Sequence, residues 1–222
     1  MDQQQLPTGE TILIVDDSAA NLRLLAQMLS EHGYRVRAAA SGPRALESVD
    51  LEPPNLILLD IRMKGMDGFE VCRRLKAQPS TQGIPVIFIS ALTETEDKLR
   101  AFQTGGVDYV TKPFQLEEVL ARIETHLALR RLQTRLEAAN RKFARELALA
   151  GKVQCGFLPA ELPQPAGYQM AAHLKPAREM SGDFYDLFGL PNGRFALVMA
   201  DVVDKGVAAA LFMALSWSLI RT

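Results

Sequence analysis

The first half of the chain alternates short apolar runs with amphipathic stretches. Strands are predicted at 11–15, 34–38, 55–59, 84–89 and 107–110, and helices near 19–31, 43–49, 68–77 and 97–103. The first, third and fourth runs are almost continuous in Ile, Leu and Val, which is typical of strands buried on both faces of a parallel sheet. This order predicts an α/β fold with a doubly wound, five-stranded parallel sheet covered by helices.

From Gln115 to Ala150 the apolar positions recur every three or four residues, without Pro or Gly. Two stripes are offset near Ala128; they consist of Leu116, Leu120, Ile123 and Leu127, and of Leu129, Leu132, Leu136, Ala139 and Phe143. A single helix of about 36 residues would be roughly 54 Å long, more than a globular domain usually needs. We therefore predict a coiled coil or helical spacer; the alternative is an extra helix lying on its own domain.

The helical pattern ends at the prolines of 158–165. Two strand-like runs follow at 168–174 and 195–199, with a turn at 191–193, and a final apolar helix at 207–221. That helix is too short for a membrane span, so we expect it to be buried. The predicted organisation is a flexible tail at 1–10, a first domain at 11–127, a helical linker at 128–153 and an α+β segment at 154–222.

The amino-acid composition limits the expected binding partners and cellular location. The 222 residues carry 25 Lys+Arg and 26 Asp+Glu, so a general attraction to nucleic acid or to an anionic membrane is not expected. Two cysteines are too few for a disulfide framework, and the N-terminus lacks a signal-peptide pattern. We expect a cytoplasmic protein. A DNA-binding regulator is disfavoured, because the arginines of the linker are interleaved with glutamates and no helix-turn-helix follows the first domain.

Five polar residues fall at the C-terminal ends of the predicted strands. Asp16 and Asp17 follow the first strand, Asp60 the third, Ser90 the fourth and Lys112 the fifth. Ligands of open parallel sheets bind at this edge. Grouped carboxylates call for a cation, and oxygen ligands suit Mg²⁺. A carboxylate nucleophile, a hydroxyl, a lysine and a metal together predict phosphoryl transfer, although each residue alone would be read as a helix cap or a turn.

At these positions the sequence resembles the response-regulator receiver family over about residues 11–127, with a flavodoxin-like fold. The matching segments are Ile14-Val-Asp-Asp-Ser18, Leu59-Asp-Ile-Arg-Met-Lys-Gly-Met-Asp-Gly68, Ile89-Ser-Ala91 and Asp108-Tyr-Val-Thr-Lys-Pro-Phe114. Lys64 and Gly106 depart from the Pro and Ala that the family often has.

The resemblance implies roles for these residues. Asp60 would accept a phosphoryl group, as an acyl phosphate, from a histidine kinase or phosphotransfer protein. Mg²⁺ would be bound by Asp16, Asp17, Asp60 and the backbone carbonyl of Arg62. Ser90 and Lys112 would hold phosphoryl oxygens, Tyr109 would be the switch aromatic, and the Lys112–Pro113 bond would be cis.

A second acidic pair lies near the C-terminus, where Asp183 and Asp201 stand 18 residues apart. If the two strand-like runs pair as a hairpin, both carboxylates could meet and hold Mg²⁺ or Mn²⁺. Ordinary turn chemistry at Ser181-Gly-Asp183 and a helix cap at Asp201 are the alternatives.

This segment resembles the start of PPM-type, metal-dependent serine/threonine phosphatases of the SpoIIE and RsbU kind. The Leu158-Pro, Leu162-Pro, Gly182-Asp-Phe-Tyr-Asp186 and Ala200-Asp-Val elements carry the likeness. It implies Asp183, Asp201 and the backbone carbonyl of Val202 as metal ligands, and a two-metal site that activates water. The later acidic motifs have no counterpart in 154–222, so we expect a shortened chain or natural fragment that is not itself a competent phosphatase.

Taken together, the two resemblances imply a response regulator whose phosphorylation controls a phosphatase acting on phosphoserine or phosphothreonine, for example in a regulator of an anti-sigma system. We expect a homodimer through the linker helix. The alternative is a phosphorylation-gated binding adaptor whose phosphatase-like region is inactive.

Overall fold

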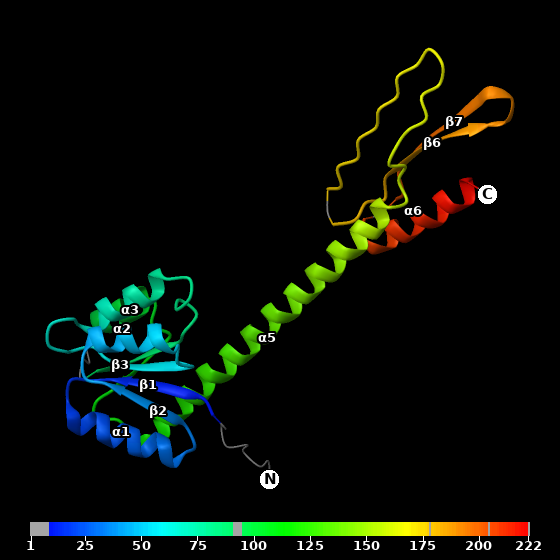
Figure 1. Cartoon of the computed structure of the whole chain (residues 1–222). Coiled ribbons are helices and arrows are strands. Elements are labelled where there is room, and N and C mark those ends of the chain that lie inside the picture. Colours follow the sequence, from blue (N-terminus) through cyan, green and yellow to red (C-terminus); the bar gives the residue numbers. More distant parts are fainter. Residues whose placement is uncertain (1–8, 91–94, 178, 204, 222) are drawn as a thin grey trace, which may run out of the picture. The chain divides into compact units, whose positions relative to one another are not determined.

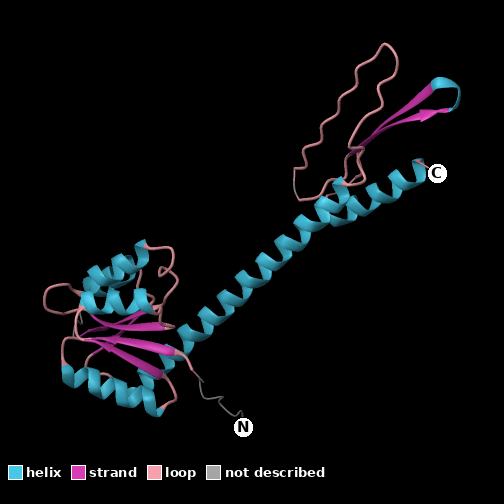
Figure 2. Ribbon diagram, viewed as in Figure 1, coloured by secondary structure: helices cyan, strands magenta, loops and turns pink. Residues whose placement is uncertain are grey.

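The computed structural model describes residues 9–90, 95–177, 179–203 and 205–221. The chain divides into two compact units, Met1–Thr134 and Arg135–Thr222, and each is considered by itself. Figure 1 labels the elements, and Figure 2 separates helices from strands.

The N-terminal unit is built on a five-stranded parallel sheet in the order β2-β1-β3-β4-β5. Its elements are β1 (Thr11–Val15), α1 (Ala19–Glu31), β2 (Arg35–Ala39), α2 (Gly42–Leu51), β3 (Leu56–Asp60), α3 (Gly68–Ala77), β4 (Val86–Ser90), α4 (Thr95–Gln103) and β5 (Asp108–Thr111). This is the flavodoxin-like order, in which the chain reverses its direction of travel between β1 and β3. The predicted doubly wound sheet is confirmed.

Two apolar layers cover the sheet. On one face Leu13, Ile57 and Phe88 pack with side chains of α2 and α3. On the other face Ile12 and Leu58 pack with side chains of α1 and of the first turns of α5. Figure 1 shows α1 on one side of the sheet and α2 and α3 on the other. All residues of β1, β3 and β4 are buried, which explains why their sequences are continuous in apolar residues.

Helix α5 (Leu116–Cys155) has 40 residues and ends later than the sequence predicts. Of its first apolar stripe, Ile123 and Leu127 are buried in the core of the N-terminal unit and Leu120 packs against it; Val119 is buried there as well. The second stripe is exposed: Leu132, Leu136 and Phe143 keep 61%, 63% and 64% of their surface. The long helix is confirmed, and the coiled coil stays a prediction.

The C-terminal unit contains an antiparallel hairpin and a helix. The hairpin pairs β6 (Phe184–Leu190) with β7 (Arg194–Ala200) across the short 3₁₀ turn Pro191–Gly193. The prediction of a strand at 168–174 was wrong, since those residues form no ladder and Tyr168 is 69% exposed. The reason is local: the turn at 191–193, with Asn192 at φ 67°, places the immediately preceding segment beside β7.

Helix α6 (Val207–Ile220) also differs from expectation. We expected a buried helix, but only Ala209, Ala210 and Met213 are buried. The exposed side chains include Leu211, Phe212, Leu215 and Leu219. A hairpin and a few loops offer too little surface to enclose a helix that is apolar on every side. Within the described residues, no helix is long and apolar enough to cross a membrane.

Candidate functional site

Three carboxylates meet at the C-terminal edge of the five-stranded sheet. Asp16 and Asp17 directly follow β1, and Asp60 is the last residue of its neighbour β3. One oxygen from each lies within 4.8 Å of the others. The parallel pairing of β1 and β3 is what brings residues more than forty positions apart to one place.

Backbone and side-chain donors hold two of these carboxylates. Asp16 accepts hydrogen bonds from the Ser18 N–H and from the Asn21 side-chain amide, both at 2.8 Å. Asp17 accepts one from the Lys64 N–H at 3.0 Å. Sequence reasoning missed Asn21, although its place in the first turn of α1, just after the acidic pair, was an available signal. It also missed the backbone of Lys64, which depends on the loop after β3.

Lys112 forms ion pairs with two of the three carboxylates. Its Nζ lies 2.9 Å from Asp16 Oδ2 and 3.0 Å from Asp60 Oδ2. Burial works against its charged form, but the hydrogen bonds to Asp16 and Asp60 prevail and raise its pKa above the ordinary value. The Lys112–Pro113 peptide bond is cis, as expected.

Asp60 lies in a partly desolvated position, with its side chain 9% exposed. Burial raises the pKa of its carboxyl and nearby Asp16 adds to the rise, while the hydrogen bonds from Lys112 and from the backbone of Arg62 oppose it. One lysine cannot neutralise three carboxylates, so the cluster suits a hard divalent cation such as Mg²⁺. The residues that could hold it are Asp16, Asp17 and Asp60; the part of the Arg62 carbonyl rests on the family resemblance.

The chain turns sharply behind Asp60. The Gly68 N–H donates to the Ile61 carbonyl at 2.9 Å, and a Cβ at Gly68 would lie 2.2 Å from the Asp60 carbonyl oxygen. Only glycine fits there without a backbone shift. Asp67 caps α3 by accepting from the Glu70 N–H at 2.7 Å. This close packing fixes the backbone that presents Asp60.

Ser90 lies at this edge, and Tyr109 of the neighbouring strand β5 is paired with Phe88, two residues before Ser90. Ser90 ends β4, is 4% exposed and pairs in register with Thr111 of β5. Its carbonyl accepts a hydrogen bond from the Lys112 N–H at 2.7 Å. The half-buried Tyr109 ring has an edge contact with Phe102 and lies 4.9 Å from Lys98 Nζ. Ala91 of the predicted motif lies outside the described residues.

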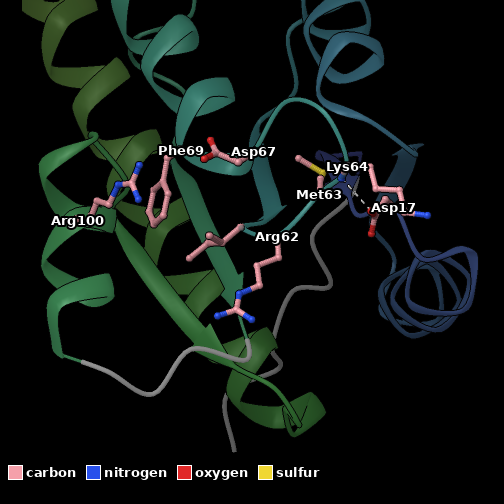
Figure 3. Close-up of a pocket in the computed structure, with 8 residues that line it drawn as sticks. Asp17, Arg62, Met63, Lys64, Asp67, Phe69 and Arg100 are labelled. Atoms are coloured by element: carbon pink, nitrogen blue, oxygen red, sulfur yellow. Dashed lines mark hydrogen bonds between the residues drawn. The ribbon is translucent and has the colours of Figure 1, made fainter.

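A cleft of about 480 Å³ adjoins the acidic cluster and reaches from Asp17 to Arg100. Arg62, Lys64, Asp67 and Phe69 contribute to its walls (Figure 3). The Arg100 guanidinium lies 4.4 Å from the centre of the Phe69 ring. The lining carries three basic side chains, Arg62, Lys64 and Arg100, and two acidic ones, Asp17 and Asp67, so its positive charges are in slight excess.

The second acidic pair lies in the C-terminal unit. Asp183 directly precedes β6 and Asp201 directly follows β7, and the adjoining residues Phe184 and Ala200 are paired in register. The carboxylates therefore meet at the open end of the hairpin, but with a different partner strand from the predicted one. A hydrogen bond with Asp201 raises the pKa of the Asp183 carboxyl.

A smaller cavity of about 280 Å³ contains both carboxylates and is lined by Ala177, Met180, Ser181, Gly182, Asp183, Asp201 and Lys205. The Val202 carbonyl oxygen is beside it, since a Cβ at Gly182 would lie 2.9 Å from that atom. The structure thus brings Asp183, Asp201 and the Val202 carbonyl to one region.

The flavodoxin-like fold and the acidic sheet edge define a signal-receiver domain. The family model described as "Response regulator receiver domain" matches residues 12–124, and the chain belongs to this family. Residues 12–124 are thus the receiver domain of a two-component response regulator, and such domains typically bind Mg²⁺ at an acidic site and interact with histidine kinases or phosphotransfer proteins.

Curated relatives match about half of the chain. "Response regulator PleD" of Caulobacter vibrioides is 44% identical over 114 residues, which are 51% of this chain and 25% of PleD. A "Probable cyclic di-GMP phosphodiesterase" of Vibrio cholerae is 45% identical over 121 residues, 54% of this chain and 27% of that protein. The chain therefore spans about a quarter of the length of these relatives.

A solved structure gives the same picture. The receiver domain protein from Methanospirillum hungatei is 28% identical, with a TM-score of 0.54; the match covers 57% of this chain and 99% of that structure.

Proposed function

We propose that Asp60 is the phosphoacceptor of this response regulator. The observation that supports it is the position of Lys112, whose ammonium group lies within 3.0 Å of both Asp16 and Asp60. A carboxylate at the open edge of the sheet, beside a fixed cation and a metal-binding cluster, is arranged to receive an anionic phosphoryl group.

In the proposed reaction an Asp60 carboxylate oxygen attacks the phosphorus of a phosphohistidine. A phosphorus–oxygen bond forms, the phosphorus–nitrogen bond breaks, and the imidazole nitrogen keeps the electron pair. Lys112 and the Ser90 hydroxyl hold oxygens of the transferred group. A bound Mg²⁺ supplies neutralisation of negative charge at the three carboxylates. Arg62, Lys64 and Arg100 in the adjoining cleft would attract the anionic donor.

A small phosphodonor tests this step. Acetyl phosphate with Mg²⁺ should add one phosphoryl group to the chain, seen by intact-mass spectrometry. Borohydride reduction of the acyl phosphate should locate it at Asp60. Asp60→Asn should remove the modification, whereas Asp50→Asn, a change at an exposed position of α2, should keep it. Labelling that persists in Asp60→Asn would show that another residue is the acceptor.

We further propose that the output is a metal-dependent protein serine/threonine phosphatase, to which residues 154–222 contribute the first ligands. The supporting observation is the meeting of Asp183 and Asp201 at one cavity beside the Val202 carbonyl. Oxygen donors of this kind suit Mg²⁺ or Mn²⁺. The substrate would be a phosphoserine or phosphothreonine protein, for example a regulator of an anti-sigma system.

Helix α5 is the proposed connection between the two functions, and pairing of two copies along its exposed stripe is the proposed means. Leu132, Leu136 and Phe143 leave more than half of their surface to solvent, and ion pairs such as Arg141–Glu137 flank them. Phosphorylation would change the surface around Ser90 and Tyr109 and so bias this pairing.

Two Gly residues inserted after Arg141 should uncouple the receiver from the output. Insertion shifts the phase of the apolar stripe and lowers local helix propensity. In the full-length protein, dephosphorylation of a phosphoserine substrate should stop responding to the state of Asp60. Insertion of seven residues, which restores the heptad phase, is the matched control. Unchanged coupling in the two-glycine variant would contradict the proposal.

The alternative is a phosphorylation-gated adaptor that binds a partner through an inactive phosphatase-like region. The exposed apolar side chains of α6, among them Leu211 and Leu215, are the observation that favours it. Metal binding at Asp183 and Asp201 discriminates the two, since an adaptor has no need of paired metal ligands.

A further inference from the structure

A glutamine in the last turn of α5 is buried against a loop. Gln154 is only 6% exposed. Its Oε1 accepts a hydrogen bond from the Ser181 N–H at 3.0 Å, and its Nε2 donates to the Ser181 carbonyl. One amide thus satisfies both backbone groups of a residue that lies in neither a helix nor a strand.

The loop that Gln154 holds leads directly to the second acidic pair. The Ser181 hydroxyl accepts a hydrogen bond from the Asp183 N–H at 3.0 Å. Gly182, between them, lies against the Val202 carbonyl and the Cβ of Ala209 in α6. Ser181, Gly182 and Asp183 all line the cavity that also contains Asp201. The position of Ser181 therefore sets the position of the Asp183 carboxylate.

A second contact on the same helix face fixes the same loop. Gly151 is buried one turn before Gln154, and a Cβ there would lie 2.0 Å from the Glu179 carbonyl oxygen. No side chain fits between helix and loop at this point. Residues 151 and 154 are three apart, so they share one face of the helix. The helix touches the loop by close approach at one residue and by two hydrogen bonds at the other.

We infer that Gln154 is a positioning residue for the Asp183–Asp201 site, and that with Gly151 it relays the position of the last turn of α5 to the Asp183 carboxylate. This inference rests on the proposed function, in which Asp183 and Asp201 hold a divalent metal. Groups that orient metal ligands without touching the metal are worth about 10- to 100-fold in metal affinity. Gln154 orients Asp183 through Ser181.

Mn²⁺ binding to the whole chain tests the inference, with free Mn²⁺ measured by electron paramagnetic resonance. All proteins compared carry Asp17→Asn, which weakens metal binding at the receiver cluster. The measured Mn²⁺ binding then reports on the Asp183–Asp201 site. Gln154→Leu should lower Mn²⁺ affinity at that site about 10- to 100-fold, because the Ser181 backbone loses both partners. Gln154→Glu keeps the acceptor for the Ser181 N–H and should recover part of the affinity. Gly151→Ala should also weaken binding, by displacing the loop.

Lys152→Ala, an exposed position of the same helical turn, is the matched control and should bind as the parent does. Fluorescence of Trp217, the one tryptophan of the chain, reports whether the C-terminal unit is folded in each variant. Parental affinity in a folded Gln154→Leu chain, with affinity lost in Asp183→Asn, would overturn the inference and leave the proposed metal site standing. Binding that is insensitive to Asp183→Asn would reject the metal site, and the inference with it.

Discussion

The two units of the chain use similar apolar sequences with opposite results. Strands β3 and β4 of the receiver are buried along their whole length. Strand β7 reads Arg-Phe-Ala-Leu-Val-Met-Ala, yet Leu197 and Met199 are 64% and 82% exposed. The receiver sheet has helices on both faces, whereas the two-stranded sheet has few neighbours. Burial comes from the neighbours that a strand acquires, and its own residues only make burial possible.

The same contrast applies to the sites. In the receiver cluster Asp16 and Asp60 are buried, at 2% and 7% exposure, while Asp17 is exposed, and Lys112 balances part of the negative charge. Asp183 and Asp201 are exposed, and the proximity of Asp201 raises the pKa of the Asp183 carboxyl. The first arrangement is complete within its own domain. The second provides ligands whose geometry depends on a loop and on the end of α5.

The largest effect on stability should appear when the same type of substitution, Leu→Ala, is compared between the two units. Leu58→Ala in β3 removes a side chain with no exposed surface and should destabilise the receiver by about 2–5 kcal/mol, from lost burial and the cavity left behind. Leu197→Ala in β7 should change stability by less than about 0.5 kcal/mol, because that side chain is mostly exposed. Urea unfolding followed by circular dichroism and by Trp217 fluorescence measures the two units. Equal losses of stability in Leu58→Ala and Leu197→Ala would contradict the difference in burial between the two units.

A middle-sized effect concerns the ion pair between the exposed Arg221 and the buried Asp186 in the C-terminal unit. The Arg221 guanidinium donates twice to Asp186, at 2.6 and 2.8 Å, and Asp186 is 1% exposed. Arg221→Met leaves this carboxylate without its charged partner and should cost about 2 kcal/mol. Unfolding monitored by Trp217 fluorescence is the measurement. A neutral result would mean that this unit is not held by its polar interior.

The same pair predicts a pH dependence. Hydrogen bonds from Arg221 lower the pKa of the Asp186 carboxyl below its ordinary value near 4. A depressed folded-state pKa stabilises the fold above the unfolded value, and this contribution is lost as pH falls through the folded value. The C-terminal unit should therefore weaken below about pH 4, and Asp186→Asn should flatten the dependence. A steeper acid loss in Asp186→Asn would contradict this assignment.

The smallest effect sharpens the account of the receiver core. The Tyr34 hydroxyl is buried and has no hydrogen-bond partner among the described residues. Burial and the nearby Glu124 and Glu10 raise the pKa of Tyr34 to about 12. Tyr34→Phe should be neutral or stabilise the receiver by up to about 1 kcal/mol in thermal unfolding at pH 7.

Alkaline titration gives a second reading of the same group. A raised folded-state pKa stabilises the fold below the unfolded value near 10, and that contribution is lost as pH rises toward 12. Tyr34→Phe should lose this part of the alkaline destabilisation. If the parent and Tyr34→Phe unfold identically between pH 10 and 12, the hydroxyl is not in the desolvated position described.

The receiver could be predicted closely from sequence, because its signals are local. Strands β1, β3 and β4 are continuous apolar runs, and Asp16, Asp60 and Lys112 stand at or just after strand ends, where a parallel sheet brings them together. The C-terminal unit could be predicted less well. Strand β6 was missed and a strand at 168–174 was wrongly expected, because pairing depends on which segment the turn at 191–193 brings to β7.

In both units, features that depend on tertiary contacts could not be predicted from the sequence. The exposure of α6 depends on what packs beside it, and the role of Gln154 depends on a loop 27 residues further on. The Lys64 N–H that bonds Asp17 depends on the path of the loop after β3. In each case the sequence gives the residue type, but it does not show which residue lies beside it in the folded chain.

The central claim is that the state of Asp60 reaches helix α5. Light scattering measures the mass of the 24.5 kDa chain with and without beryllofluoride and Mg²⁺, which mimic phosphoryl-Asp60. We predict a larger dimer fraction with the mimic, and no change in Asp60→Asn. An unchanged mass in the parent, with fluorine NMR showing the mimic bound, would contradict control through pairing of α5.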